Sequence, residues 1–145
     1  SVSATWEGGV KNRINVGNFP AFYSDEPNEL SGGNSAPTPA DYLLSGAMTC
    51  FATTFEILAT IEGVELTAVN VNVSGSVGLT KLFEESYFDE IIVHLNVQSP
   101  ASATKIQELA EKALNASPMM RSLRANKSLI VELYENGSIG FRFFW

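Results

Sequence analysis

The stretch "DYLLSGAMTCFATTFEILATIEGVEL", residues 41–66, is a long apolar segment that contains the only cysteine of the chain, Cys50. Its length and composition predict a helix from about residue 40 to residue 61. Thr38 suits the N-cap of that helix and Pro39 suits its first turn. Because apolar side chains occupy nearly every side of the helix, we expect it to be buried on all sides.

Small residues lie one helical turn from Cys50, with Gly46 and Ala47 before it and Thr53 and Thr54 after it. Such residues allow a second helix to approach closely, or leave a pocket in front of the sulfur. A chain of 145 residues that has one other long helical segment covers this helix most easily with a second subunit. We therefore expect a homodimer in which the helix packs against its symmetry mate.

The remaining segments predict one α+β domain that spans residues 1–145. Short alternating stretches indicate a hairpin or meander, and the Pro-, Gly- and Ser-rich stretch after them indicates an ordered loop. Gly63 ends the central helix, and two long strands, an amphipathic helix, a short helical turn opened by Pro118 and a final pair of strands around Asn136-Gly137 follow. In chain order these segments are 3–9, 12–24, 25–39, 65–78, 87–99, 102–116, 117–125 and 127–145.

Composition and charge argue against several classes of partner. With 9 basic and 16 acidic residues the chain carries a net charge of −7, which argues against nucleic acids and anionic membrane surfaces. One cysteine forms no intrachain disulfide and no signal peptide is recognisable, so we expect a cytoplasmic protein. Glu56 and Glu62 interrupt the central apolar run, so we expect that run not to span a membrane.

Taken by itself, Cys50 has two interpretations. A free cysteine is commonly a small buried apolar residue, and Cys50 lies too far into its helix for the helix dipole to favour a thiolate. A reactive thiolate would need a cation from elsewhere in the fold, and His94, the only histidine, lies in a strand pattern and is a weak candidate. One cysteine and one histidine do not make a zinc site, and no nucleotide-binding loop is recognisable, so we expect neither a metal nor another cofactor.

Two segments of the chain resemble the OsmC/Ohr family, the osmotically inducible and organic-hydroperoxide-resistance proteins. The first is "DEP", residues 25–27, followed by "GGNSAPTPADYLLSGAMTC", residues 32–50. The second is "VQSPASATKIQELAEKALNASPMMRSL", residues 97–123. The resemblance implies an α+β OsmC-like fold, assembled as an intertwined homodimer whose two central helices are sandwiched by curved, mainly antiparallel sheets.

The resemblance also implies roles for individual residues. In the catalytic branches of the family a first cysteine attacks a hydroperoxide, a second cysteine converts the sulfenic acid into a disulfide, and an external dithiol reduces that disulfide. The resemblance places Cys50 at the first position and Ser117 at the second. It makes Arg13 the candidate for the arginine that activates the thiolate, and Asp41 the candidate for the carboxylate beside it, with Glu26 as a substitute.

Two functions stay open at this point. A serine hydroxyl does not condense with a sulfenic acid to a disulfide, so the two-cysteine cycle is not available within one chain. The protein would then be a one-cysteine peroxidase of the stress response, with a hydroperoxide as substrate and a small external thiol as reductant. The alternative is a non-catalytic homodimer that binds a small apolar ligand beside the central helix. Ser117, Met119 and Met120 would line that site, although methionines at this spacing are more often core residues.

Overall fold

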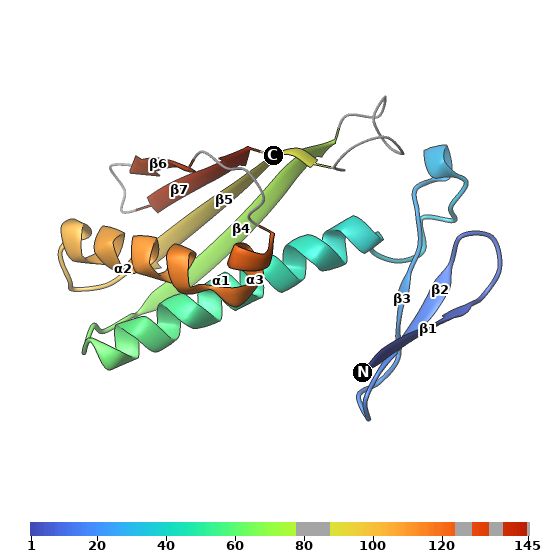
Figure 1. The fold of residues 1–145 in the computed structure, drawn as a ribbon, viewed down its shortest axis with the longest axis horizontal. Coiled ribbons are helices and arrows are strands. Elements are labelled where there is room, and N and C mark those ends of the chain that lie inside the picture. The colour runs from blue at the N-terminus through green and yellow to red at the C-terminus, as the bar shows by residue number, and fades with distance from the viewer. Residues whose placement is uncertain (78–87, 124–128, 134–137, 145) are drawn as a thin grey trace. The chain divides into compact units, whose positions relative to one another are not determined.

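The structure, a computed structural model, describes residues 1–77, 88–123, 129–133 and 138–144 (Figure 1). The chain divides into two compact units, Ser1–Leu43 and Leu44–Trp145. Both units contain antiparallel sheets, and the helices form separate runs of the chain. The α+β class predicted from the sequence is therefore confirmed.

The first unit is built on a three-stranded antiparallel sheet in the order β1-β2-β3. Its strands are Val2–Trp6 (β1), Asn12–Val16 (β2) and Phe22–Ser24 (β3), in the region where the sequence predicts a hairpin or meander. A loop follows, with one short 3-10 turn, η1, at Asn28–Leu30. This loop leads to the start of the long helix α1.

Helix α1 spans Pro39–Ile61, and both of its ends follow from local sequence signals. At the start, the Thr38 hydroxyl accepts the Asp41 N–H (3.2 Å) while the Asp41 carboxylate accepts the Thr38 N–H (2.8 Å). At the end, Gly63 takes a left-handed φ of 68°, and the N–H of Val64 donates to the carbonyl of Ala59 (2.8 Å). The predicted N-cap and C-terminal glycine are confirmed.

The second unit contains a four-stranded antiparallel sheet in the order β4-β5-β7-β6, with α1 and α2 on one of its faces (Figure 1). The predicted elements are present, although β4 begins three residues later than the alternating pattern does. The predicted turn at Asn136-Gly137 lies outside the described residues. The elements are β4 (Ala68–Val77), β5 (Phe88–Gln98), α2 (Ala103–Ala116), α3 (Pro118–Ser122), β6 (Leu129–Leu133) and β7 (Ser138–Phe144).

The core of the second unit lies between β5 and the two long helices. Alternate residues of β5 point into it, and each helix contributes one stripe of side chains. The buried apolar residues are Ala47, Phe51, Phe55 and Ala59 of α1, Phe88, Ile91, Val93, Leu95 and Val97 of β5, Ile106, Leu109, Ala110, Ala113 and Leu114 of α2, and Met120 of α3.

Helix α1 is covered on one side only. Leu43, Ile57 and Ile61 are 46%, 53% and 73% exposed, so the single chain does not bury the helix on all sides, and the expected full burial requires a second subunit. The reason is that the apolar side chains of α1 surround the helix, whereas the buried stripe that packs in the core occupies one side of it. The remaining apolar surface faces outward.

The expectation that α1 is too polar to span a membrane also needs correction. By length and composition alone, α1 is long and apolar enough to cross a membrane. Glu62 lies beyond the last helical residue, which leaves Asp41 and Glu56 as the charged residues of α1. Core helices of soluble proteins meet the same criterion, so this is weak evidence for a membrane.

Candidate functional site

Cys50 lies in the middle of α1 and is partly exposed. With 3.6 residues per turn, Cys50 is on the same side of the helix as the exposed residues Leu43, Ile57 and Ile61. Its neighbour Phe51 belongs to the buried stripe. The sulfur therefore lies at the border between the core and the uncovered apolar side of α1.

The side chain of Ser117 contacts the sulfur of Cys50 from the segment that joins α2 and α3. This serine lies between α2 and α3, is fully buried, and donates its hydroxyl to Sγ of Cys50 at an Oγ–Sγ distance of 3.4 Å. The two residues are 67 positions apart in the chain. The fold thus brings together the two positions at which the resemblance implies a pair of cysteines.

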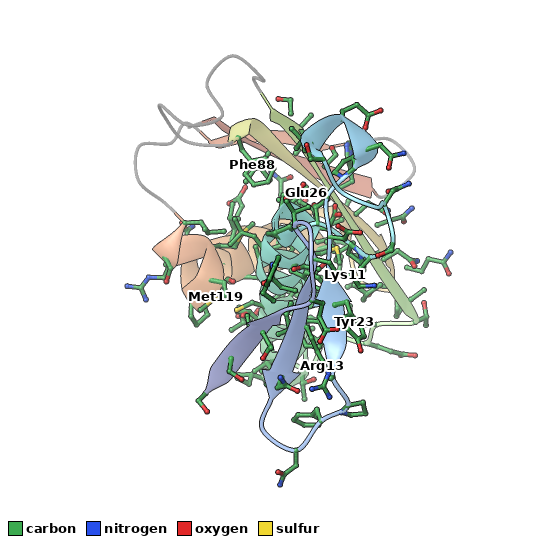
Figure 2. The ribbon with its side chains drawn as sticks, turned by 90° about the vertical axis from the view of Figure 1, so that its right-hand side faces the viewer. Lys11, Arg13, Tyr23, Glu26, Phe88 and Met119 are labelled. Atoms are coloured by element: carbon green, nitrogen blue, oxygen red, sulfur yellow. The ribbon has the colours of Figure 1, made fainter. Side chains whose placement is uncertain are left out.

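The two methionines that follow Ser117 do not share one environment. Met120 is buried in the core, whereas Met119, labelled in Figure 2, is 45% exposed. Pro118 opens the short helix α3, as the sequence predicts. Met120 therefore fits the role of a core residue, and Met119 is the methionine whose side chain is available to a ligand.

Arg13 lies in the first unit, on β2, directly opposite Tyr23 of β3. It is exposed, and the face that carries it has a second cation, because Nζ of Lys11 lies 5.0 Å from the centre of the Tyr23 ring (Figure 2). Asp41 belongs to α1 itself, nine residues before Cys50. At 3.6 residues per turn Asp41 lies on the opposite side of the helix, where its carboxylate caps the first turn.

A buried carboxylate that the sequence reasoning overlooked organises the loop of the first unit. The Asp25 carboxylate accepts the hydroxyl of Ser35 (2.8 Å) and the backbone N–H groups of Glu26 (2.9 Å), Gly33 (3.1 Å) and Ser35 (3.1 Å). The Ser35 hydroxyl and these N–H donors hold the pKa of Asp25 at about 2. A Cβ added at Gly32 would collide with the backbone of Glu26, so this position requires glycine.

The acid considered as a substitute, Glu26, has a different environment from Asp25. Its Oε2 atom is buried and has no hydrogen-bond partner among the residues that the structure describes. The signal that identifies Asp25 instead is the combination of "DEP", residues 25–27, with the glycine pair at 32–33 and Ser35. A short carboxylate that precedes such a loop by about ten residues is placed to collect its N–H groups.

His94 does not approach the sulfur from the core. It lies on β5 opposite Asn72 of β4, on the face away from its buried neighbours Val93 and Leu95. Within the described ranges, no group of three or more His, Cys, Asp or Glu side chains is arranged to hold a metal ion. The chemistry that the site offers therefore centres on the Cys50 thiol and the Ser117 hydroxyl.

Comparison with known proteins gives one family and a set of solved structures. The model of the family described as "OsmC-like protein" matches residues 32–132. An OsmC-like protein from Mycoplasma pneumoniae is 22% identical, with 85% of each chain covered and a TM-score of 0.75. No curated protein matches the chain.

Two further structures are organic hydroperoxide resistance proteins. The one from Legionella pneumophila, also described as a predicted redox protein, is 20% identical over 87% of this chain and 90% of that chain, with a TM-score of 0.71. The one from Elizabethkingia anophelis, with thiocyanate bound, is 23% identical over 86% and 87% of the two chains, with a TM-score of 0.71. At these identities the structures establish the fold.

Proposed function

Because this chain belongs to the OsmC-like protein family, we propose that it is a one-cysteine peroxidase in which Cys50 reduces organic hydroperoxides. The contact between Ser117 and Cys50 carries the proposal, since it pairs the expected nucleophile with a hydroxyl in place of a second thiol. The hydroperoxide resistance of two structural neighbours supports this class of substrate.

In the first step the Cys50 thiolate attacks the terminal oxygen of the hydroperoxide. A sulfur–oxygen bond forms and the oxygen–oxygen bond breaks, so the sulfur is oxidised to sulfenic acid and the peroxide is reduced to an alcohol. A proton passes to the departing alkoxide. Ser117 offers no thiol, so no disulfide forms within the chain.

An external thiol then completes the cycle. One thiol condenses with the sulfenic acid, which releases water and leaves a mixed disulfide on Cys50. A second thiol attacks that disulfide, restores the Cys50 thiol and leaves as the oxidised reductant. The partly exposed position of Cys50 is compatible with access by a small thiol.

A cation beside the sulfur would favour the thiolate, and Arg13 is our candidate for it. Arg13 is exposed on the first unit and makes no ion pair with the described residues. We propose that the guanidinium, from the same or a second copy, approaches Cys50 in the assembled protein. Asp41 is a weaker candidate for the accompanying carboxylate, because it caps its own helix.

We further propose that the protein is a cytoplasmic homodimer, and that the two units of each chain form one OsmC-like domain. The uncovered side of α1 supports the dimer, because the apolar side chains of Leu43, Ile57 and Ile61 are exposed there. Gly46 lies on the same side with open space in front of it. A stable monomer at micromolar concentration in sedimentation would refute the dimer.

The enzymatic proposal is tested with wild-type protein and the Cys50→Ser variant. Wild-type protein treated with one equivalent of an organic hydroperoxide should yield a trappable sulfenic acid and should consume further peroxide when a small thiol is supplied. The variant should do neither. If wild-type protein consumes peroxide no faster than a free thiol does, the peroxidase hypothesis is wrong and a ligand-binding dimer becomes the better hypothesis.

A further inference from the structure

The backbone of Ser117 is fixed on both sides by the helices that meet there. Its N–H donates to the carbonyl of Ala113 (2.8 Å) at the end of α2, and its carbonyl accepts the N–H of Arg121 (2.9 Å) in α3. The side chain has no exposed surface. Ser117 is therefore an enclosed position whose backbone is fixed by two hydrogen bonds.

The direction of this hydroxyl is unusual for a serine at a helix start. A serine in the N-cap position normally accepts an N–H of the first turn. Ser117 is the N-cap of α3 and makes no such side-chain hydrogen bond; its hydroxyl instead donates to Sγ of Cys50. A fully buried hydroxyl needs a partner, and here the sulfur is that partner.

We propose that Ser117 is a catalytic residue that stabilises the anionic sulfur of Cys50. A neutral thiol is a weak hydrogen-bond acceptor, whereas a thiolate accepts a charge-assisted hydrogen bond. A donor fixed at 3.4 Å from the sulfur therefore favours the anion over the thiol, and it needs no rearrangement when the charge forms. With Ser117 in place of a second cysteine, no disulfide can form at this position. The Ser117 hydroxyl still donates a hydrogen bond to the sulfur, and the peroxide does not oxidise it.

This inference rests on the proposed peroxidase function for its meaning, but its test does not depend on peroxide. Cys50 is the only cysteine, so a neutral alkylating reagent reports on this sulfur alone. Ser117→Ala should lower the alkylation rate about tenfold at one fixed pH near neutrality, because a hydrogen bond to a charged group is lost. Ser122→Ala is the matched control, since the Ser122 hydroxyl of the same helix donates to the Pro118 carbonyl (2.9 Å) and not to sulfur.

A second pair of variants keeps the test decisive if Ser117→Ala fails to fold. Ser117→Thr and Ser117→Val have the same shape and impose the same added volume, but only the threonine retains a hydroxyl. The valine variant should react about tenfold more slowly than the threonine variant. The S–H stretching band, which arises from Cys50 alone, should be stronger in the alanine and valine variants at the same pH.

Equal alkylation rates and equal S–H bands with and without the hydroxyl would overturn the role of Ser117. Slower alkylation without the hydroxyl supports that role even if wild-type protein proves unable to consume hydroperoxide. The failure of the peroxidase proposal and the failure of this inference thus give different results.

Discussion

The carboxylate of Asp25 and the side chain and backbone of Ser35, ten residues apart, are joined by two hydrogen bonds of 2.8 and 3.1 Å. These bonds close the loop that leads from β3 to α1. The carboxylate accepts two more N–H groups, from Glu26 and Gly33, so four donors converge on one buried charge. The loop is therefore held by the ionised form of Asp25.

The first prediction is that the loop between β3 and α1 becomes less stable in acid. The Ser35 hydroxyl and the backbone donors lower the pKa of Asp25 from 3.8 to about 2. A depressed folded-state pKa contributes stability above the unfolded value, and that contribution is lost as the pH falls from about 4 towards 2. The protection of the Gly33 and Ser35 amides against hydrogen exchange, relative to the intrinsic exchange rate at each pH, should therefore fall over this interval.

Asp25→Asn should remove most of this pH dependence and lower the melting temperature, because an amide nitrogen would meet N–H donors in place of one carboxylate oxygen. Glu29→Gln is the matched control, since Glu29 is an exposed acid of the same loop. If Asp25→Asn and Glu29→Gln give the same exchange profiles as wild-type protein, the carboxylate does not hold the loop.

The second prediction tests the pairing of Ser117 with Cys50. Ser117→Cys should form an intramolecular disulfide with Cys50 when treated with hydroperoxide, because a donor–acceptor distance of 3.4 Å leaves a small movement to reach bonding distance. The variant should also resist irreversible oxidation to sulfinic acid. Non-reducing peptide mapping identifies the bond.

Ser122→Cys provides the comparison for this experiment, because Ser122 is exposed on the same short helix. It should form no intramolecular disulfide at the same oxidant concentration. A Ser117→Cys protein that remains reduced while Cys50 is oxidised to sulfinic acid would show that the two positions do not face each other in solution.

The ends of α1 could be predicted because their causes are local in the sequence. Thr38 and Asp41 are three residues apart and cap each other, and Gly63 supplies the left-handed residue that ends the helix. The start of β4 could not be placed as well. Leu66 continues the alternating pattern, but pairing with β5 begins at Ala68.

The pattern of apolar and polar residues does not predict contacts between residues that are far apart in the sequence. The Cys50–Ser117 contact spans 67 positions, and only the family resemblance suggested it. The donors around Asp25 depend on the path of the loop, which no periodicity describes. Apolar composition also does not distinguish burial in the chain's own core from burial against a second subunit, so the outward side of α1 was predicted to be covered.

The third prediction concerns the attachment of α1 to α2. Glu62, just after α1, forms ion pairs with Lys112 (2.5 Å) and Lys105 (3.3 Å) of α2. The hydrogen bond from Lys112 is the main cause that lowers the pKa of Glu62 below its ordinary 4.5, and the bond to Glu62 raises the pKa of Lys112 above 10.5. The ion pairs therefore stabilise the contact between α1 and α2 most at pH values between 4.5 and 10.5, where Glu62 and Lys112 are both charged.

Glu62→Gln should lower the melting temperature at neutral pH by a few degrees at most, about 2–4 °C, since the lysines are partly exposed and salt screens the pairs. The difference from wild-type protein should begin to shrink as the pH falls below about 4.5, the ordinary pKa of a glutamate, and should disappear below the lowered pKa of Glu62, where its carboxylate gains a proton in the folded protein. Glu56→Gln, at an exposed position of α1, serves as control. A difference that persists unchanged in acid would exclude the ion pairs as its cause.

The last prediction separates the stability of the chain from the stability of the proposed dimer. Phe55 is fully buried in the core, whereas Ile57, two residues later on α1, is 53% exposed. Phe55→Ala should destabilise the fold by about 3–5 kcal/mol, because it removes a large side chain and leaves a cavity.

Ile57→Glu should leave the fold of each chain intact and weaken association, since it places a charge on the uncovered apolar side. Wild-type protein should show a melting temperature that rises with protein concentration, as expected for a dimer, and Ile57→Glu should abolish that dependence. Ser45→Glu, at an exposed position on another side of α1, should preserve it. If Ile57→Glu sediments and melts as wild-type protein does, the outward side of α1 is not the subunit contact, and its exposed apolar residues need a different explanation.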